Sequence, residues 1–315
     1  MLELAKSTLS DDGSSRFVWR LAGGHEVESV LFRTTPASFI QPSAQLGGDA
    51  LRLPSGVVVC VSSQSGCNVG CPFCATGLQP MRRNLSAAEI CAQVLQAMRA
   101  EQVSGGVRVV FAGMGEPLLN YESVRDAAVQ LTAQPEVLNV AISTTGIVPA
   151  IQRLAAEAPG VDLYVSLHAA TDRLRDTLVP VNRRYPIGAV LAAAREFAAF
   201  TGRRVDISYL LLRGINDTQE DARELAALLN PGPFTVKLLL WNEVTGLPFR
   251  RVTDEQAVQF AGWLAGHGQP AYVIPSKARD VNAGCGQMIT AEPSVVRLRR
   301  ITRDFEAVSQ EWGSQ

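Results

Sequence analysis

Features that would place the protein in a membrane or outside the cell are missing from its 315 residues. No run of about 18 apolar residues is present, so we expect no membrane-spanning helix and no membrane partner. The first residues lack a basic segment followed by a long apolar one, which argues against secretion. The chain has six cysteines, three of them clustered, a usage typical of a reduced protein. These observations favour a cytoplasmic protein.

The chain also lacks a basic excess, with 29 Lys and Arg against 30 Asp and Glu. Nucleic-acid enzymes often carry a positive charge, so the net charge of −1 gives RNA binding no support. Local basic patches are present, but such patches are more often solvated surface than phosphate sites. They lie at residues 82–83, 183–184, 203–204 and 297–303.

Two common cofactor signatures are absent as well. No G-x-G-x-x-G motif follows the first expected strand, which argues against an open dinucleotide-binding sheet. A closed zinc site commonly needs a second pair of Cys or His ligands. The next cysteines after the clustered three are Cys91 and the distant Cys285, and the nearest later histidine is His168. The sequence therefore does not supply an obvious fourth ligand.

The clustered cysteines are Cys67, Cys71 and Cys74, in a C-x3-C-x2-C array directly after the apolar run 56–61. Three thiolates on a short loop can each hold one iron of a 4Fe–4S cluster and leave the fourth iron open to a small molecule. A zinc ion and a set of inert buried thiols are the alternatives. The spacing favours the iron–sulfur cluster.

From residue 57 onward, β-branched runs alternate with Ala- and Leu-rich helical stretches. Strands that alternate with helices need crossover connections, which predicts an α/β protein with a parallel sheet. Six or seven such units fit a barrel or partial barrel over residues 56–290. The expected strands are 57–61, 107–112, 140–144, 163–167, 205–211, 236–241 and 271–274, and the expected helices are 87–100, 122–133, 148–156, 187–200, 218–229 and 254–265.

The two ends of the chain form separate regions in this interpretation. Residues 16–21 and 26–32 alternate in polarity around a Gly-Gly turn, which predicts a β-hairpin. We expect residues 1–55 to be a small N-terminal β unit with a linker, and residues 291–315 to be a C-terminal helical tail.

Polar and glycine residues follow the expected strands, one strand after another. Because the active site of an α/β barrel lies at the C-terminal ends of its strands, these residues should converge. Glycines let a ligand approach the backbone, and hydroxyl, amide and imidazole groups can bond a carboxylate, a ribose or an adenine edge. The candidates are Gly113, Gly115, Glu116, Ser143, Ser166, Leu167, His168 and Asn242.

Seven motifs in a fixed order make the chain resemble the radical S-adenosylmethionine RNA adenine methyltransferases. They are residues 60–67, 113–118, 143–146, 166–168, 180–182, 214–217 and 283–287. The resemblance runs from about Phe17 to Met288 and implies a partial (β/α)6 barrel of the radical S-adenosylmethionine type. In that family, carbon 2 or carbon 8 of adenosine is methylated in 23S rRNA, and carbon 2 also in tRNA.

The resemblance also implies roles for individual residues. Cys67, Cys71 and Cys74 would hold the cluster, and the strand-end residues named above would bind S-adenosylmethionine, two molecules per turnover. Cys285 would carry the methyl group to the base, giving a protein–RNA crosslink. Cys60 would resolve that crosslink as a disulfide, and Glu28 would accept a proton. A one-electron donor such as flavodoxin would reduce the cluster.

The chain departs from the family pattern in three places, one of which is Leu240, where the family usually has a proline. Only about 16 residues precede the first expected strand, where the family usually carries a helical region. The segment 275–281, just before Cys285, also differs from the usual one. Two alternatives therefore remain beside adenine-C2 methylation of RNA. One is the same two-cysteine chemistry on a non-RNA substrate, and the other is a non-catalytic iron–sulfur or zinc module.

Overall fold

A ten-stranded mixed sheet organises the protein, seen here in a computed structural model that describes residues 2–35, 56–158, 160–291 and 293–312. The strand order is β1-β2-β3-β4-β7-β8-β9-β10-β11-β12. The run from β4 to β12 is parallel, as the alternation of strands and helices predicted. These strands are β4 (Gly56–Cys60), β7 (Val107–Phe111), β8 (Val137–Thr144), β9 (Asp162–Ser166), β10 (Val205–Leu211), β11 (Phe234–Leu240) and β12 (Ala271–Ile274).

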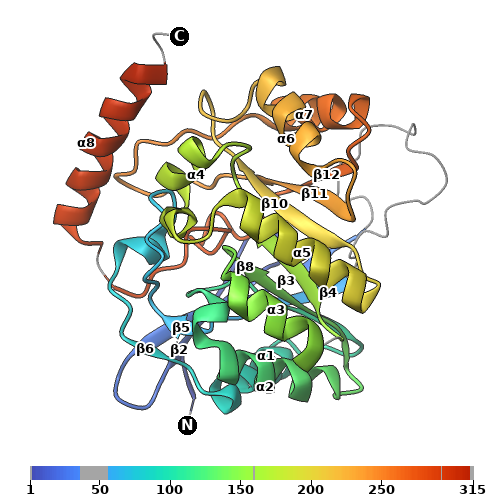
Figure 1. Ribbon diagram of the computed structural model, residues 1–315. Coiled ribbons are helices and arrows are strands. Elements are labelled where there is room, and N and C mark those ends of the chain that lie inside the picture. The colour runs from blue at the N-terminus through green and yellow to red at the C-terminus, as the bar shows by residue number, and fades with distance from the viewer. Residues whose placement is uncertain (1, 36–55, 159, 292, 313–315) are drawn as a thin grey trace.

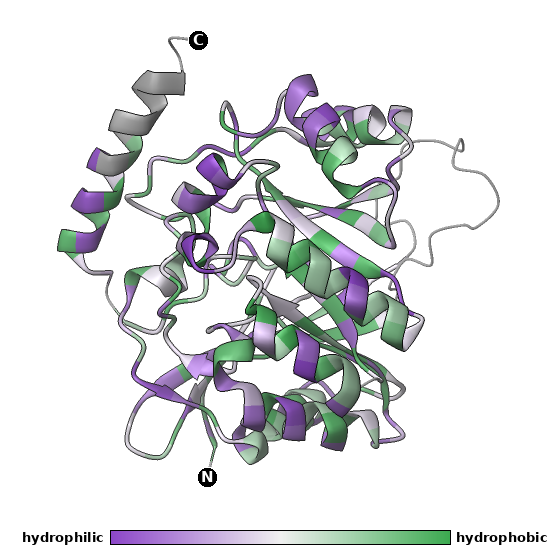
Figure 2. Ribbon diagram, viewed as in Figure 1, coloured by the Kyte–Doolittle hydropathy of each residue, from purple (hydrophilic) through white to green (hydrophobic). Residues whose placement is uncertain are grey.

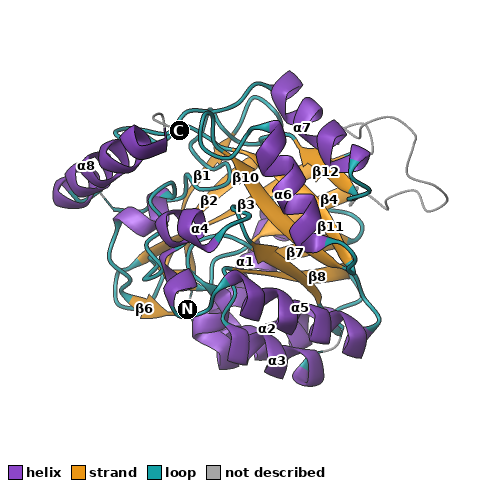
Figure 3. Cartoon of the chain, turned by 45° about the horizontal axis from the view of Figure 1, so that its top comes forward, coloured by secondary structure: helices purple, strands orange, loops and turns teal. Residues whose placement is uncertain are grey.

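Helices follow the parallel strands and flank the sheet (Figures 1 and 3). Three of them begin at capping boxes, which satisfy backbone N–H groups of the first turn: Ser86 for α1, Thr218 for α6 and Thr253 for α7. The predicted α/β partial barrel and its six helices are confirmed. These helices are α1 (Ala87–Ala100), α2 (Tyr121–Thr132), α3 (Val148–Glu157), α5 (Ile187–Thr201), α6 (Gln219–Leu229) and α7 (Asp254–Gly266).

The two faces of the sheet pack into different cores. On β10, Val205, Ile207 and Tyr209 join the large core beneath the helices. Leu210 joins a second cluster on the opposite face, together with the three clustered cysteines. The residues of a strand alternate between two faces, so this second cluster lies on the inner face of the partial barrel. Figure 2 shows mostly hydrophobic strands and mixed helices, as this layering requires.

The N-terminal strands extend the main sheet. The predicted hairpin is present as β2 (Ser15–Arg20) and β3 (Glu26–Thr34). β3 pairs with β4 in antiparallel fashion, with Val30 opposite Cys60. The strand β1 (Glu3–Leu9) pairs with β2 and was not predicted. The predicted boundary at residue 55 lies outside the described residues, so the division into domains stays a prediction.

The C-terminal helix α8 (Val295–Trp312) lies at the edge of the molecule, beyond α4 (Asp172–Leu178) (Figure 1). It attaches through its apolar side, where the ring of Phe305 lies 4.7 Å from that of Phe249. Its Arg297 donates to the carbonyl of Gly77 at 2.9 Å. The helix α8 therefore packs beside the cysteine loop, and the assignment of residues 291–315 as a separate tail stays a prediction. In the described part of the chain, no helix is both long enough and apolar enough to cross a membrane.

Candidate functional site

The three clustered cysteines lie on a tight loop between β5 (Gln64–Ser65) and the 3-10 helix η2 (Ala75–Leu78). The Cys74 N–H donates to the Cys71 carbonyl at 3.2 Å, and the Gly77 N–H donates to the Cys74 carbonyl at 3.0 Å. A Cβ on Gly77 would lie 2.9 Å from the Cys71 oxygen, so a glycine is needed for this close turn. None of the three thiols is in a disulfide. The loop therefore presents three free sulfur ligands together.

The electrostatic surroundings of these thiols suit a metal cluster. Burial raises the pKa of Cys67 to about 12 and that of Cys71 well above its ordinary value, and the neighbouring cysteines add to both shifts. A bound metal deprotonates its thiol ligands outright and would supply the missing positive charge. Among the described residues, no three Cys, His, Asp or Glu converge on one metal ion. A cubane needs no such convergence, because each cysteine holds a different iron.

A buried cation that sequence reasoning missed lies beside this loop. Arg175, on α4, is fully buried. Its guanidinium donates to the carbonyls of Thr145 at 2.6 Å, Ser166 at 3.0 Å and Leu167 at 3.0 Å. Its charge lowers the pKa of Cys71, although burial lowers its own pKa to about 10. Arg175 thus joins the ends of β8 and β9. The available signal was its partner Asn182, which belongs to a family motif and accepts from Arg175 at 2.8 Å.

The predicted ligand Glu116 is already saturated with hydrogen bonds. Its carboxylate accepts from the Thr144 hydroxyl at 2.7 Å, from both the N–H and the hydroxyl of Thr145 at 2.7 and 2.8 Å, and from the Leu118 N–H at 3.0 Å. Burial raises the pKa of this carboxyl in spite of these donors. The side chain therefore fixes the 113–117 loop to the end of β8. The left-handed φ of +105° at Gly115 brings that loop close to Gln64.

The predicted ligand His168 is a buried, neutral imidazole just after β9. Its Nδ1 accepts from the Leu210 N–H at 3.0 Å, which places the ring proton on Nε2. Burial, with a smaller effect of Arg175, lowers the pKa of His168 to about 3. Its φ of +62° turns the chain sharply at the strand end. Ser143 and Ser166 lie at the C-terminal ends of β8 and β9 and are both partly buried.

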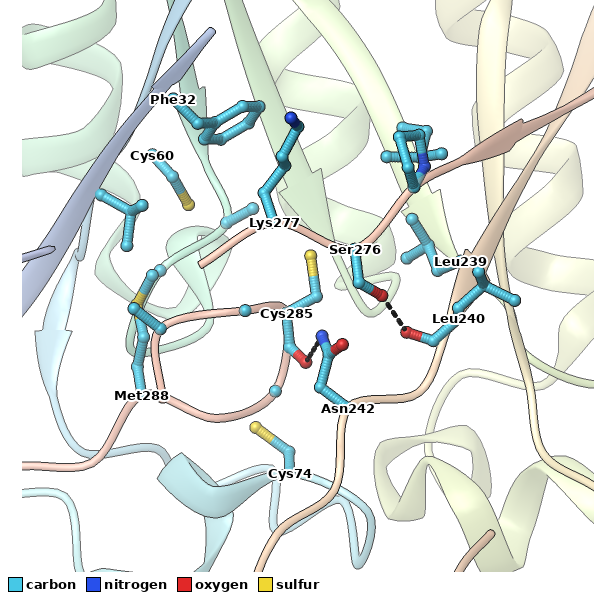
Figure 4. A pocket seen from close by; sticks show the side chains of 18 of the residues that line it. Phe32, Cys60, Cys74, Leu239, Leu240, Asn242, Ser276, Lys277, Cys285 and Met288 are labelled. Carbon is cyan, nitrogen blue, oxygen red and sulfur yellow. Dashed lines mark hydrogen bonds between the residues drawn. The ribbon is translucent and has the colours of Figure 1, made fainter. Parts of the chain in front are cut away.

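A cavity of about 120 Å³ unites the cysteines that the sequence placed far apart. Cys60, at the end of β4, lines it together with Cys74, Asn242 and Cys285 (Figure 4). Figure 4 shows the Cys285 side chain between those of Cys60 and Cys74. Both predicted reactive cysteines thus face one cavity that a cluster cysteine also lines. Of the predicted cofactor residues, Gly113 and Asn242 line this cavity, whereas Gly115, Glu116, Ser143, Ser166, Leu167 and His168 do not.

A second, partly buried cation acts electrostatically on Cys60 and Cys285. Lys237, on β11, has its Nζ 3.7 Å from the centre of the Tyr164 ring. Burial raises the pKa of Cys60 to about 12. The pKa of Cys285, which is exposed, is raised as well, and the charge of Lys237 opposes both shifts. Lys237 therefore favours the thiolate forms of both cysteines. The sequence signal is a single lysine within the apolar run 236–241, a pattern that predicts only a strand.

The predicted proton acceptor Glu28 is fully buried on β3 but does not line the cavity. Its carboxylate forms an ion pair with Arg16, whose Nε donates to it at 3.0 Å. The same Arg16 donates to the carbonyl of Val281, in the segment that precedes Cys285, at 3.0 Å. Glu28 therefore lies beneath the Cys285 segment, and its role as a base stays a prediction.

Similarity to known proteins extends over nearly the whole chain. A family model described as the radical SAM superfamily matches residues 61–229. The probable dual-specificity RNA methyltransferase RlmN of Acidothermus cellulolyticus is 42% identical, over 91% of this chain and 71% of the relative. The dual-specificity RNA methyltransferase RlmN of an Anaeromyxobacter species is 40% identical, over 91% of this chain and 74% of the relative.

A solved structure matches at the level of the fold as well. The crystal structure of a radical SAM methyltransferase from Sphaerobacter thermophilus has a TM-score of 0.80 and 39% sequence identity to this chain. The match covers 91% of this chain and 81% of that one. The similarity therefore includes both the strands of the partial barrel and the sequence they carry.

Proposed function

Because the chain belongs to the radical SAM methyltransferases of the RlmN type, we propose that it methylates a ring carbon of adenine in RNA. We favour carbon 2 over carbon 8, in 23S rRNA and also in tRNA, in the cytoplasm. One observation carries the proposal: Cys60, Cys285 and the cluster ligand Cys74 line the same cavity. A module that only holds a metal needs neither Cys60 nor Cys285.

The radical SAM family implies a 4Fe–4S cluster and S-adenosylmethionine, and Cys67, Cys71 and Cys74 would hold the cluster. When bound, these groups supply the methyl group and a carbon-centred radical. An adenine ring carbon is a poor nucleophile, so ordinary methyl transfer to it fails and radical chemistry is required. We propose two molecules of S-adenosylmethionine per turnover, one for each role.

The two cysteines of the cavity divide the remaining work in this proposal. The Cys285 thiolate accepts the methyl group, and the carbon-centred radical then takes a hydrogen atom from that methyl group. The resulting methylene carbon on the Cys285 sulfur adds to the adenine ring carbon, and loss of one electron and of the ring proton leaves protein and RNA joined covalently. The Cys60 thiolate then attacks the Cys285 sulfur, the bond from that sulfur to the methylene carbon breaks, and this carbon takes a proton to become the methyl group. The methylated base is released, and a disulfide remains between the two cysteines. The charge of Lys237 supports both steps, because each needs a thiolate.

The cysteine loop borders a second cavity, which we propose as the docking site of the electron donor. This cavity of about 400 Å³ is lined by Cys67, Arg183, Arg297 and Arg300 among others. Cys285 lines the first cavity and not this one, so we assign the first cavity to the base. We therefore assign the arginine-lined cavity to an acidic one-electron donor protein such as flavodoxin. Charge reversal at Arg183 should slow reduction of the cluster by that donor and leave reduction by dithionite unchanged.

The mutants Cys285→Ala and Cys60→Ala test the division of work, because they must fail differently. Cys285→Ala has no acceptor for the methyl group and should form no protein–RNA species. Cys60→Ala can still join the base but has no thiolate to release it, so it should accumulate covalently bound RNA. Denaturing electrophoresis of both proteins, purified from cells, distinguishes the two. Identical behaviour without bound nucleic acid would contradict the mechanism and the RNA substrate.

A second candidate is the same chemistry on a non-RNA substrate. The net charge of −1 and the altered segment 275–281 favour it. Mass spectrometry of nucleosides from a host that lacks its own adenine-C2 methyltransferase decides between the two. A new methyladenosine supports RNA methylation. Its absence, together with methylated Cys285 in the purified protein, supports the alternative.

A further inference from the structure

The side chain of Asn242 uses only one end of its amide. This residue follows β11, lines the cavity and is 1% exposed. Its Nδ2 donates to the backbone carbonyl of Cys285 at 3.1 Å (Figure 4). A carbonyl can only accept, so this bond fixes the orientation of the amide. The other end, Oδ1, is buried and has no hydrogen-bond partner among the described residues. The buried Oδ1 of Asn242 therefore needs a hydrogen-bond donor that the described residues do not supply.

The loop that carries Cys285 packs directly on this amide. A Cβ on Gly284 would lie 2.5 Å from Nδ2 and 2.9 Å from Cγ of Asn242. Only glycine allows this approach. Gln287 supports the contact, because its Oε1 accepts from the Gly284 N–H at 3.0 Å and its Nε2 donates to the Glu243 carbonyl at 2.9 Å. The loop and the strand end thus fit each other closely at Asn242.

Hydrogen bonds outside this contact hold the loop at both ends. On one side, Asp280 accepts from the Ser10 hydroxyl at 2.5 Å and from the Asp11 N–H at 2.9 Å. On the other side, the Ala75 N–H donates to the Gly286 carbonyl at 2.7 Å. The short stretch between these anchors carries Cys285. Asn242 holds it at the end of a barrel strand.

We propose that Asn242 is a positioning residue that links the cofactor to the methyl-carrying cysteine. Its Nδ2 docks the Cys285 loop, and its Oδ1 takes a hydrogen-bond donor of bound S-adenosylmethionine, such as a ribose hydroxyl. This inference depends on the proposed function. The coupling is reciprocal: a ligand that fixes the amide stabilises the docked loop, and the docked loop orients the amide for the ligand.

Hydrogen exchange of the anaerobically reconstituted protein tests the link without any turnover. S-adenosylhomocysteine is the probe, because it has no methyl group to transfer and leaves Cys285 unmodified. In the wild type it should slow exchange in the peptide that spans residues 283–288 about fivefold or more. Asn242→Ala should exchange fast with or without the probe, and should bind it about tenfold more weakly.

Two further variants separate the two ends of the amide. Asn242→Asp keeps an acceptor for the ligand but sets a carboxylate oxygen against the Cys285 carbonyl. It should bind the probe, yet the probe should no longer protect the loop. Gly284→Ala should displace the amide and weaken probe binding about threefold or more, although it removes no atom that contacts the ligand. Gly188→Ala, on α5, is the matched control, because its Cβ would meet nothing within 4 Å.

The outcomes that overturn the link differ from those that overturn the function. Normal probe binding with unchanged loop exchange in the wild type would remove the link alone. The same conclusion follows if the probe protects the loop of Asn242→Asp as well as that of the wild type. Failure of the wild type, with its cluster in place, to bind the probe at all would remove the proposed function and the link together.

Discussion

Cys60 and Cys285 face one cavity from opposite kinds of backbone. Cys60 ends a strand that is paired on both sides, with Val30 of β3 and Val110 of β7. Cys285 lies in a loop between two glycines, and its carbonyl bonds the side chain of Asn242. One cysteine therefore has a position set by the sheet. The other has a position set by a few contacts that can be broken singly.

The difference indicates which sulfur moves when the two must meet. Two sulfurs bond only when their Cα atoms come within about 7 Å. Displacing Cys60 would disrupt a buried sheet, whereas displacing Cys285 breaks hydrogen bonds that contribute about 0.5–1.5 kcal/mol each. The loop is therefore the moving partner. Each substitution below removes a residue on which the position or the reactivity of Cys60 or Cys285 depends.

The largest effect should come from removing a cluster ligand, on which the proposed chemistry of both cysteines depends. Cys71→Ala should lower the iron content after anaerobic reconstitution from about four per chain to nearly none. Cys91→Ala, on α1, is the control and should keep its iron. Iron and sulfide assays measure both proteins. Retention of the cluster in Cys71→Ala, or stoichiometric zinc in the wild type, would contradict the cluster assignment.

Removing Arg175 should destabilise the sheet that fixes Cys60. Arg175→Met leaves the carbonyls of Thr145, Ser166 and Leu167 without this donor. We expect the free energy of unfolding to fall by about 3–5 kcal/mol, as is typical when part of a buried charged network is removed. Urea denaturation measures it. Arg173→Met, an exposed change on the same helix, should stay within about 0.5 kcal/mol of the wild type. Equal stability of the two variants would contradict the structural role of Arg175.

Removing Lys237 should make both thiols less reactive without moving them. The lysine charge lowers the pKa of Cys60 and Cys285, so Lys237→Met should raise both values. At a given pH below these values the thiolate fraction then falls, by about tenfold for each pKa unit. The pH profile of iodoacetamide labelling, followed by mass spectrometry, should move to higher pH. Lys277→Met, on the cavity lining, is the control. A profile at unchanged pH would contradict the proposed effect of Lys237.

The smallest effect should come from loosening one anchor of the mobile side. Asp280→Ala removes the acceptor for Ser10 and Asp11. We expect amide exchange in residues 278–285 to rise about threefold to tenfold, as the loss of roughly 1 kcal/mol implies. Hydrogen exchange with mass spectrometry checks it, and the strands of the barrel should not change. Equal exchange in the variant and the wild type would show that the other contacts suffice.

The parallel strands and most helices could be predicted because each carries its own signal. Runs such as 57–60 are apolar and β-branched, and Ser86 and Thr218 cap the helices that follow them. Two elements lacked that signal. The strand β1 is mostly exposed, so it shows no clear alternation of buried and exposed residues. The helix α4 is short and charged, and it resembles a loop in sequence.

The residues of the candidate site also differ in whether the local sequence identifies them. The cysteines could be identified because their spacing and motifs are local. The surroundings of Arg175 and Lys237 could not, since they depend on residues from several strands. The contact between Asn242 and Cys285 spans 43 positions and depends on how the loop folds back. The predicted ligand Glu116 was assigned by its motif, and its four hydrogen bonds within the chain were not foreseen.

The exposed edge strand β1 has a consequence for how the protein behaves at high concentration. An edge strand offers unpaired backbone groups to the same edge of a second molecule, and charged side chains discourage such pairing. Glu3 and Lys6 supply charges on this strand, beside the exposed apolar residues Leu4 and Leu9. Replacing both charges with uncharged β-formers should favour aggregation. Because the turn after β1 holds the segment before Cys285, aggregates built on this edge would also restrain the part of the molecule that has to move.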